Sequence, residues 1–223
     1  MAFHAVDRLE SLPSSPPEAT YAVVDVIIST TTVVDLLDAG ARYVRPFASE
    51  SEALEFGEDD DSLVFGEQSG LPLDGFDGVP LPSATETHDV GGRRVGLYTS
   101  NGTRAIDAIG RSTDVVAAST VNAGAVAGYL AGVDGDVWLV ASGRMSTVAD
   151  EDVAGVRLVE SHLDGGVTPE LRSELELEIT ESPTAEWLGE LGFASDVERA
   201  LEFDSTDTVP VLVDGVFRRA SDV

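Results

Sequence analysis

From residue 20 onward, short apolar runs rich in β-branched residues alternate with segments of helical periodicity. The first run, Tyr21–Ile28, predicts a buried strand that ends at the polar stretch 29–32, and a helix that Gly40 closes follows. The same alternation predicts strands at 43–47, 63–65, 94–98, 114–118 and 136–141, and helices at 49–56, 103–109, 122–130, 150–163 and 195–203. Such alternation is typical of an α/β fold, a three-layer α/β/α sandwich with a mainly parallel sheet.

Local signals refine this prediction. Ser49 with Glu52 predicts a capping box, Ser182-Pro183 predicts a helix start, and Asp214-Gly215 predicts a hairpin turn. The Gly- and Pro-rich stretch 66–82 has no periodicity, and a loop of that length inside a compact domain is typically functional or disordered. We expect one domain over 1–223, with 1–19 as an irregular lead-in.

The charge balance excludes several classes of protein. All 13 basic residues are Arg, and 41 acidic residues bring the net charge to −28. Nucleic-acid binding needs a cluster of Lys and Arg residues. The sequence shows no such cluster, so no nucleic-acid partner is expected. No apolar run approaches the ~20 residues of a membrane span, and without Cys there is neither a disulfide framework nor thiolate chemistry.

The absence of Lys carries a further expectation. Asp, Glu and Arg hold water and ions more readily than the long apolar stem of Lys, so this surface suits a cytoplasm that accumulates salt. We therefore predict a halophilic, cytoplasmic protein that unfolds at low salt. The alternative is an ordinary acidic protein in which Lys is missing by chance.

Polar residues gather where the expected strands end, and ligands of parallel sheets bind beyond those ends. Helix N-termini and Ser, Thr and Asn side chains there can hold an anion such as phosphate. In so acidic a chain, the cations for that anion would be Arg104, Arg144 and a divalent metal ion. The loops concerned are 29–32, 67–83, 99–104, 119–122 and 142–152.

Each of these features also has a purely structural interpretation. The hydroxyl cluster 29–32 and the turn 101–103 can be helix caps, and the acidic stretch 150–152 can complement a helix dipole. Glu67 and Asp77 can be solvated, and the three His residues lack the spacing of a zinc site. Asp25, in the strand-like run, can be a base, a nucleophile or a metal ligand.

The chain resembles the 2-phosphosulfolactate phosphatase family over nearly all of 20–213. The most specific segments are Asn101-Gly102-Thr103-Arg104 and the helix start at Glu151-Asp152. The other matching segments are 24–31, Gly66-Glu67 with Gly70, Gly75-Phe76-Asp77, Asn122-Ala123, Gly143-Arg144, Ala154-Gly155 and the ending with Asp196, Asp204 and Val209-Pro210.

The resemblance implies an α/β/α sandwich and a Mg²⁺-dependent phosphatase that hydrolyses the phosphate ester of 2-phospho-3-sulfolactate or a related small phosphorylated acid, a step of coenzyme M biosynthesis. Mg²⁺ would be held by Glu67, Asp77, Glu151 and Asp152, because it prefers oxygen ligands. The catalytic residues would be Asp25, Asn101, Arg104 and Arg144. Substrate would contact Ser29, Thr30, Thr31, Gly102, Thr103, Asn122 and Gly143.

Three departures from the family pattern bear on the substrate. Ile28 and Gln68 stand where the family has Arg, and Gly78-Val79-Pro80 interrupts its Gly-Asn-Ser-Pro stretch. Each charge-assisted hydrogen bond is worth roughly 1.5–3 kcal/mol, so losing two would weaken binding of a multiply charged substrate. The alternative function is therefore an inactive family member that binds a small anion. Base rates of assembly favour a homodimer.

Overall fold

The computed structural model describes residues 2–68, 71–99, 109, 114–144 and 146–223. Within them a ten-stranded sheet has the order β1-β8-β2-β7-β9-β10-β3-β6-β4-β5. The strands are β1 (Phe3–Val6), β2 (Thr20–Val24), β3 (Tyr43–Phe47), β4 (Ser62–Gln68), β5 (Leu71–Pro72), β6 (Arg94–Tyr98), β7 (Asp114–Ala118), β8 (Val137–Ala141), β9 (Pro210–Val213) and β10 (Val216–Arg219). The helices are α1 (Ser29–Asp38), α2 (Glu50–Gly57), α3 (Ala84–Thr87), α5 (Ala123–Leu130), α6 (Asp150–Leu163), α7 (Pro169–Thr180), α8 (Pro183–Glu190) and α9 (Ala194–Ala200).

The sheet consists of two parallel parts joined by an antiparallel hairpin. Strands β1, β8, β2 and β7 are parallel to one another, and so are β3, β6 and β4. The hairpin β9–β10 lies between these parts and meets each through a single registered pair, Val116 with Val211 and Phe217 with Val44. The sheet is therefore mainly parallel, as predicted.

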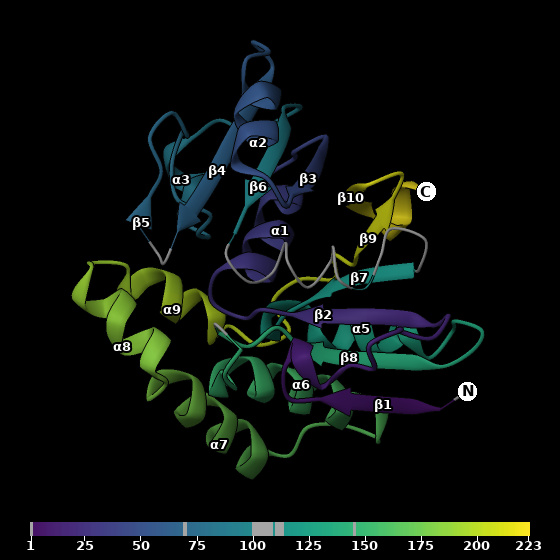
Figure 1. The fold of residues 1–223 in the computed structure, drawn as a ribbon. Helices are drawn as coiled ribbons and strands as arrows, with labels where there is room; N and C mark the ends of the chain where they lie inside the picture. The colour runs from purple at the N-terminus through teal and green to yellow at the C-terminus, as the bar shows by residue number, and fades with distance from the viewer. Residues whose placement is uncertain (1, 69–70, 100–108, 110–113, 145) are drawn as a thin grey trace.

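Alternation along β2 builds the two faces of the sandwich. Tyr21 and Val23 pack into a core shared with α1, whereas Ala22 and Val24 pack into a second core shared with α5 to α9. All four side chains are fully buried, because helices cover the strand on both faces. This arrangement confirms the three-layer α/β/α class (Figure 1).

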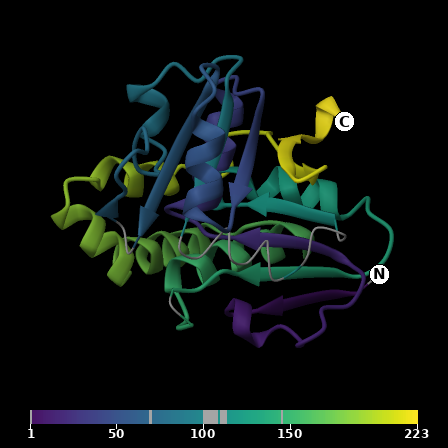
Figure 2. The same cartoon turned by 45° about the horizontal axis from the view of Figure 1, so that its top comes forward.

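The strands of one parallel part run antiparallel to those of the other part. Even so, the carboxyl ends of both parts lie in the same region of the molecule. In Figures 1 and 2 the strands of the two parts lie across one another, and the arrowheads of β2, β8, β3 and β4 point into one central region. A contact supports this view, because the hydroxyl of Thr32 at the start of α1 donates to the carbonyl of Pro80 beyond β4 at 2.8 Å. Loops far apart in sequence thus share one rim.

Most predicted elements agree with the structure. The strands at 43–47, 94–98 and 114–118 and the helix at 150–163 have the predicted bounds. The side chain of Ser182 caps α8 by accepting from the N–H of Ala185 at 3.1 Å. Asp214 and Gly215 have φ of 52° and 78°, as a two-residue hairpin turn requires.

Three predictions about the fold were wrong or incomplete. Residues 1–19 are not simply irregular, because Phe3–Val6 forms β1 and pairs with β8. Ser49 stands at the N-cap of α2 but its side chain forms no capping hydrogen bond. Helix α7 was not predicted, since its sequence is polar on most positions. The helix predicted over 103–109 lies largely outside the described residues.

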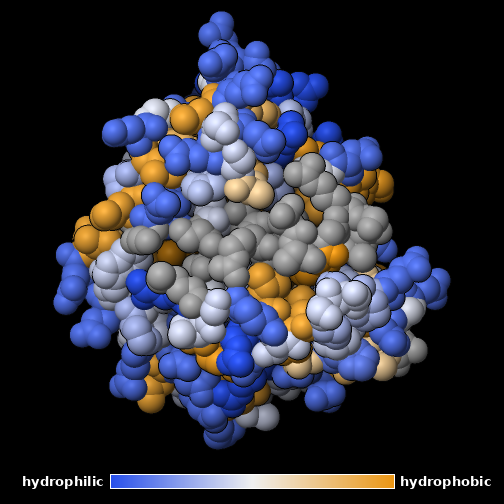
Figure 3. Space-filling view, in the orientation of Figure 1, coloured by the Kyte–Doolittle hydropathy of each residue, from blue (hydrophilic) through white to orange (hydrophobic). Residues whose placement is uncertain are grey.

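The visible surface is strongly hydrophilic. In Figure 3 hydrophilic side chains gather at the tip formed by the turn after α2, where Glu58, Asp59, Asp60 and Asp61 are exposed. No helix of the described residues has the length and apolar character that crossing a membrane requires.

Candidate functional site

The loop after β2 folds around the backbone of Asp25. Both the N–H and the hydroxyl of Thr30 donate to the Asp25 carbonyl, at 2.9 and 2.7 Å. The N–H of Ser29 donates to the Asp25 carboxylate at 3.4 Å. The hydroxyl of Thr31 donates to the Val26 carbonyl and contacts the Ser119 hydroxyl. The residues predicted to bind phosphate thus shape this loop with their own hydroxyls, and Thr31 has no exposed surface.

The first turn of α6 brings two carboxylates into the same region. Asp150 is exposed, whereas Glu151 and Asp152 are 4% and 3% exposed. The Asp152 carboxylate accepts from the N–H of Val26 at 2.8 Å and from the N–H of Gly143 at 3.0 Å. One side chain therefore holds together the loops that follow β2 and β8.

These carboxylates repel one another in a buried environment. Burial, together with the charges of Asp25 and Glu151, raises the pKa of Asp152 well above its ordinary value, although the two backbone N–H groups oppose the shift. Oε2 of Glu151 is buried and forms no hydrogen bond, and neither does the hydroxyl of Ser142 at the end of β8. A cation and an anionic ligand would satisfy what the protein leaves unsatisfied here.

The carboxylates that the structure describes in this region can hold Mg²⁺ through one or two protein ligands, but they do not form a complete cage around an ion. No three His, Asp or Glu side chains of the described ranges converge closely enough to enclose an ion. Mg²⁺ typically takes one or two carboxylates and completes its shell with water and substrate phosphate. Glu151, with an unpaired buried oxygen, and Asp25 nearby are the side chains suited to that role.

Of the predicted metal ligands, Glu67 lies on β4 and Asp77 lies beside that strand. Glu67 is 5% exposed at the end of β4 and borders a cavity together with Ile28, so it lies at the rim. Asp77 is exposed, and its carboxylate accepts from the N–H of Val64 at 2.7 Å. Val64 precedes Glu67 by three residues, about 10 Å along a strand, so the structure does not bring Asp77 to the others.

Gly143 and Arg144 follow β8 in a tight turn. Gly143 has a φ of +69°, and a Cβ there would lie 2.6 Å from the carbonyl oxygen of Thr147, so only glycine fits. The backbone of Arg144 exchanges two 2.9 Å hydrogen bonds with Thr147. The Arg144 guanidinium lies 5.1 Å from the centre of the Trp187 ring.

Asn122 is buried and its amide is engaged within the protein. It accepts from the N–H of Ser119 at 2.8 Å and donates to the carbonyl of Thr208 at 2.9 Å. With no exposed surface, Asn122 positions the loop after β7 rather than lining an open site.

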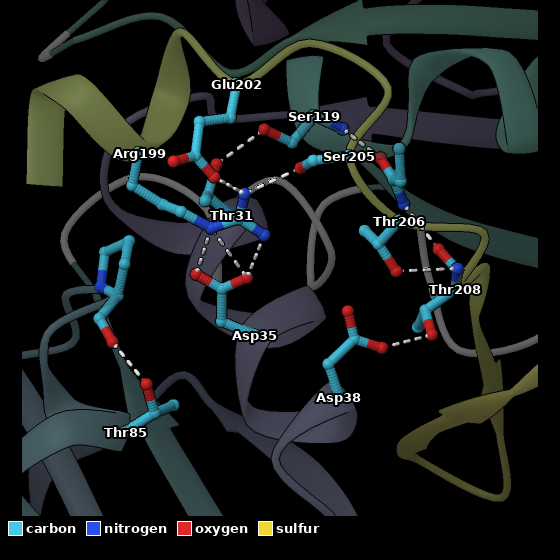
Figure 4. Close-up of polar contacts among 12 residues, drawn as sticks. Thr31, Asp35, Asp38, Thr85, Ser119, Arg199, Glu202, Ser205, Thr206 and Thr208 are labelled. Atoms are coloured by element: carbon cyan, nitrogen blue, oxygen red, sulfur yellow. Dashed lines mark hydrogen bonds and ion pairs between the residues drawn. The ribbon is translucent and has the colours of Figure 1, made fainter.

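The C-terminal segment anchors α1 beneath this rim (Figure 4). The Arg199 guanidinium pairs with Asp35 of α1 at 2.7 Å and also donates to Glu202 and Ser205. The hydroxyl of Thr208 donates to the carboxylate of Asp38. Helix α1 is thus held in its second half, at Asp35, and at its last residue, Asp38.

The structure brings together Asp25, Ser29, Thr30, Thr31, Gly143, Arg144, Glu151 and Asp152. The predicted residues Asn101, Gly102, Thr103 and Arg104 lie outside the described part of the chain. Sequence reasoning missed Ser142 and Trp187. Ser142 follows a predicted strand and could have been found by that position, but no pattern singled out Trp187.

The chain is similar to known proteins along most of its length. The family model for 2-phosphosulpholactate phosphatase matches residues 6–215. A protein of Thermotoga petrophila is 36% identical over 92% of this chain and 94% of its own length. Proteins of Carboxydothermus hydrogenoformans and Deinococcus radiodurans are each 32% identical, over 90% and 93% of this chain and 89% and 93% of their own lengths. All three bear the name "Probable 2-phosphosulfolactate phosphatase".

Proposed function

Because the chain belongs to the 2-phosphosulfolactate phosphatase family, we propose that it hydrolyses the phosphate ester of 2-phosphosulfolactate or a related small 2-phosphorylated hydroxy acid. The ester and water would give the free hydroxy acid and inorganic phosphate. We propose, as the resemblance implies, that this step belongs to coenzyme M biosynthesis.

One observation carries the proposal, the buried and unpaired Oε2 of Glu151 beside Asp152, whose pKa is raised by burial and by the charges of Asp25 and Glu151. Buried carboxylates that already repel one another cannot accept a phosphate dianion unless cations intervene, since like charges in a buried site are costly. We propose that Mg²⁺ supplies part of that charge and would be held by Glu151 and Asp25. When bound, Mg²⁺ would neutralise phosphoryl oxygens and lower the pKa of bound water.

The protein's own groups would do the rest. Asp152 would keep the loops after β2 and β8 in register, because its carboxylate is bound to both. Arg144 would contact phosphate oxygens and stabilise the charge that develops on them. Asp25 would act as metal ligand or as the base for the attacking water, and the first of these suits its interaction with Asp152.

The test is phosphate release from 2-phosphosulfolactate and from 2-phospholactate, in molar salt with Mg²⁺ titrated from a chelated start. We expect turnover that requires Mg²⁺ and that Glu151→Gln reduces by at least 100-fold, about 2.7 kcal/mol. Asp150→Asn is the matched control, because Asp150 is the exposed neighbour on the same helical turn, and it should retain activity.

The same experiment separates the alternative, an inactive anion-binding module. Ile28 favours that alternative, because its side chain lies in an apolar cavity where the family pattern has Arg. A large thermal shift with both acids, without turnover above the Glu151→Gln variant, would replace the phosphatase proposal with simple anion binding.

A further inference from the structure

Trp187 of α8 is the aromatic residue that the structure places against a proposed phosphate contact. Its ring lies 5.1 Å from the guanidinium carbon of Arg144. The preceding residue, Gly143, donates to Asp152, so the stacked pair adjoins the carboxylate cluster. A helix more than 40 residues later in the chain thereby supports the loop after β8.

Arg144, in the turn after β8, has different partners from the Arg residues on helices α6, α7 and α9. Arg157 pairs with Glu174 and Glu178, Arg172 pairs with Glu176, and Arg199 pairs with Asp35 and Glu202. Arg144 forms no ion pair with a carboxylate in the described ranges. An aromatic face attracts a guanidinium without neutralising its charge, so the charge of Arg144 stays available to an anion.

Trp187 also reaches the other side of the rim. With Leu188 it lines a small cavity of about 10 Å³ whose further walls include Ile28, Glu67 and Val79. The ring is therefore wedged between the loop after β8 and the loops after β2 and β4. Trp187 is partly buried and packs against the core on the α5–α9 side of the sheet, which makes it a support for a flexible side chain.

We propose that Trp187 is a positioning residue that holds the Arg144 guanidinium at the loop after β8, where it can receive a phosphate group. This inference rests on the proposed function of the same site. The backbone of Arg144 is fixed by Thr147 and its side chain by Trp187, so little conformational freedom remains to be lost when phosphate binds.

The first test is a double-mutant cycle on phosphate release. Trp187→Leu should lower kcat/KM roughly 5- to 30-fold, mainly through KM, and Trp187→Phe should restore most of the loss because an aromatic face remains. In an Arg144→Gln background, Trp187→Leu should have little further effect. Equal losses in both backgrounds, or a loss confined to stability, would overturn the proposal.

The second test does not depend on turnover. The chain has two Trp residues, and Trp138 stacks on His4 at the β1–β8 edge, away from the rim. Trp138→Phe therefore isolates the fluorescence of Trp187. In that background Arg144→Gln should shift the Trp187 emission, and inorganic phosphate with Mg²⁺ should change it only when Arg144 is present. Failure of hydrolysis alone would contradict the proposed function, whereas an emission unaffected by Arg144→Gln would contradict the positioning role.

Discussion

The carboxylate of Asp152 on α6 accepts a 2.8 Å hydrogen bond from the N–H of Val26, the residue that follows Asp25. Its other oxygen accepts from Gly143. Asp152→Ala would leave both buried N–H groups without partners, which typically costs about 1–3 kcal/mol each. Relief of charge repulsion offsets part of this cost, so we expect a loss of about 2 kcal/mol in the free energy of unfolding. Urea unfolding in chelator measures it.

The matched control for that measurement is Asp150→Ala. Asp150 lies two residues before Asp152 in the first turn of α6, and its side chain is exposed. The substitution removes only a favourable charge at the start of α6, worth about 0.3–1 kcal/mol. If the two variants unfold at the same urea concentration, Asp152 does not hold the loops together.

Glu151→Gln should stabilise the metal-free protein while it abolishes activity. The charge of Glu151 contributes to the raised pKa of Asp152, so removing it relieves repulsion and stabilises the folded state. In the wild type, Oε2 of Glu151 is a buried carboxylate oxygen without a hydrogen bond. Replacing the charged carboxylate by a neutral amide therefore also stabilises the folded state. Thermal unfolding of both proteins in chelator, at equal salt, measures the difference.

The same variant has a pH signature. The folded state keeps a proton on Asp152 that the unfolded chain, with an ordinary pKa of 3.8, releases. Stability from this group is therefore present at low pH and is lost as pH rises through the raised pKa. As pH rises above 3.8, the ordinary pKa of Asp, the wild type should lose more stability than Glu151→Gln. Parallel curves would show that Glu151 does not perturb Asp152.

Gly155→Ala should disturb activity through the placement of α6. A Cβ at Gly155 would lie 2.6 Å from Val26 and 2.7 Å from Val24, so α6 must move away from β2. Overpacking of this kind costs about 1–3 kcal/mol, and the displaced Glu151 should lower kcat roughly 10- to 100-fold. Steady-state kinetics and urea unfolding on the same preparation measure the two effects.

Gly128→Ala is the control for that substitution. Gly128 is exposed within α5 and a Cβ there meets nothing within 4 Å. The change should leave activity unaltered and raise stability by up to about 1 kcal/mol, because Ala favours helix. A loss of activity in both variants would point to a general effect of Gly replacement.

Low salt should unfold the wild-type protein. A net charge of −28 repels itself over about 30 Å at 0.01 M salt but over only about 3 Å at 1 M. Circular dichroism during dialysis from molar KCl should show loss of helix, and an uncharged osmolyte should not substitute fully for the salt. Full helicity at low ionic strength would contradict the halophilic interpretation.

The sequence by itself determined the class of fold and the loops to examine. The β-branched apolar run at Tyr21–Ile28 and the cap and turn residues at 182–183 and 214–215 are local signals, so they predicted a strand, a helix start and a hairpin without tertiary information. The order Asp25, Arg144, Glu151 and Asp152 also pointed to the correct strand ends, because parallel strands expose those ends together.

Only the tertiary structure decided which side chains meet and which are engaged elsewhere. Asp77 is bound to the β4 edge and Asn122 to the Thr208 carbonyl, and both bonds join residues 13 or more positions apart. Trp187 came to the rim because α8 packs across it, and packing between distant segments leaves no periodic trace in a sequence. The hairpin β9–β10 was predicted, but its position between the two parallel parts of the sheet was not, since strand order depends on which edges meet in space rather than on any local pattern.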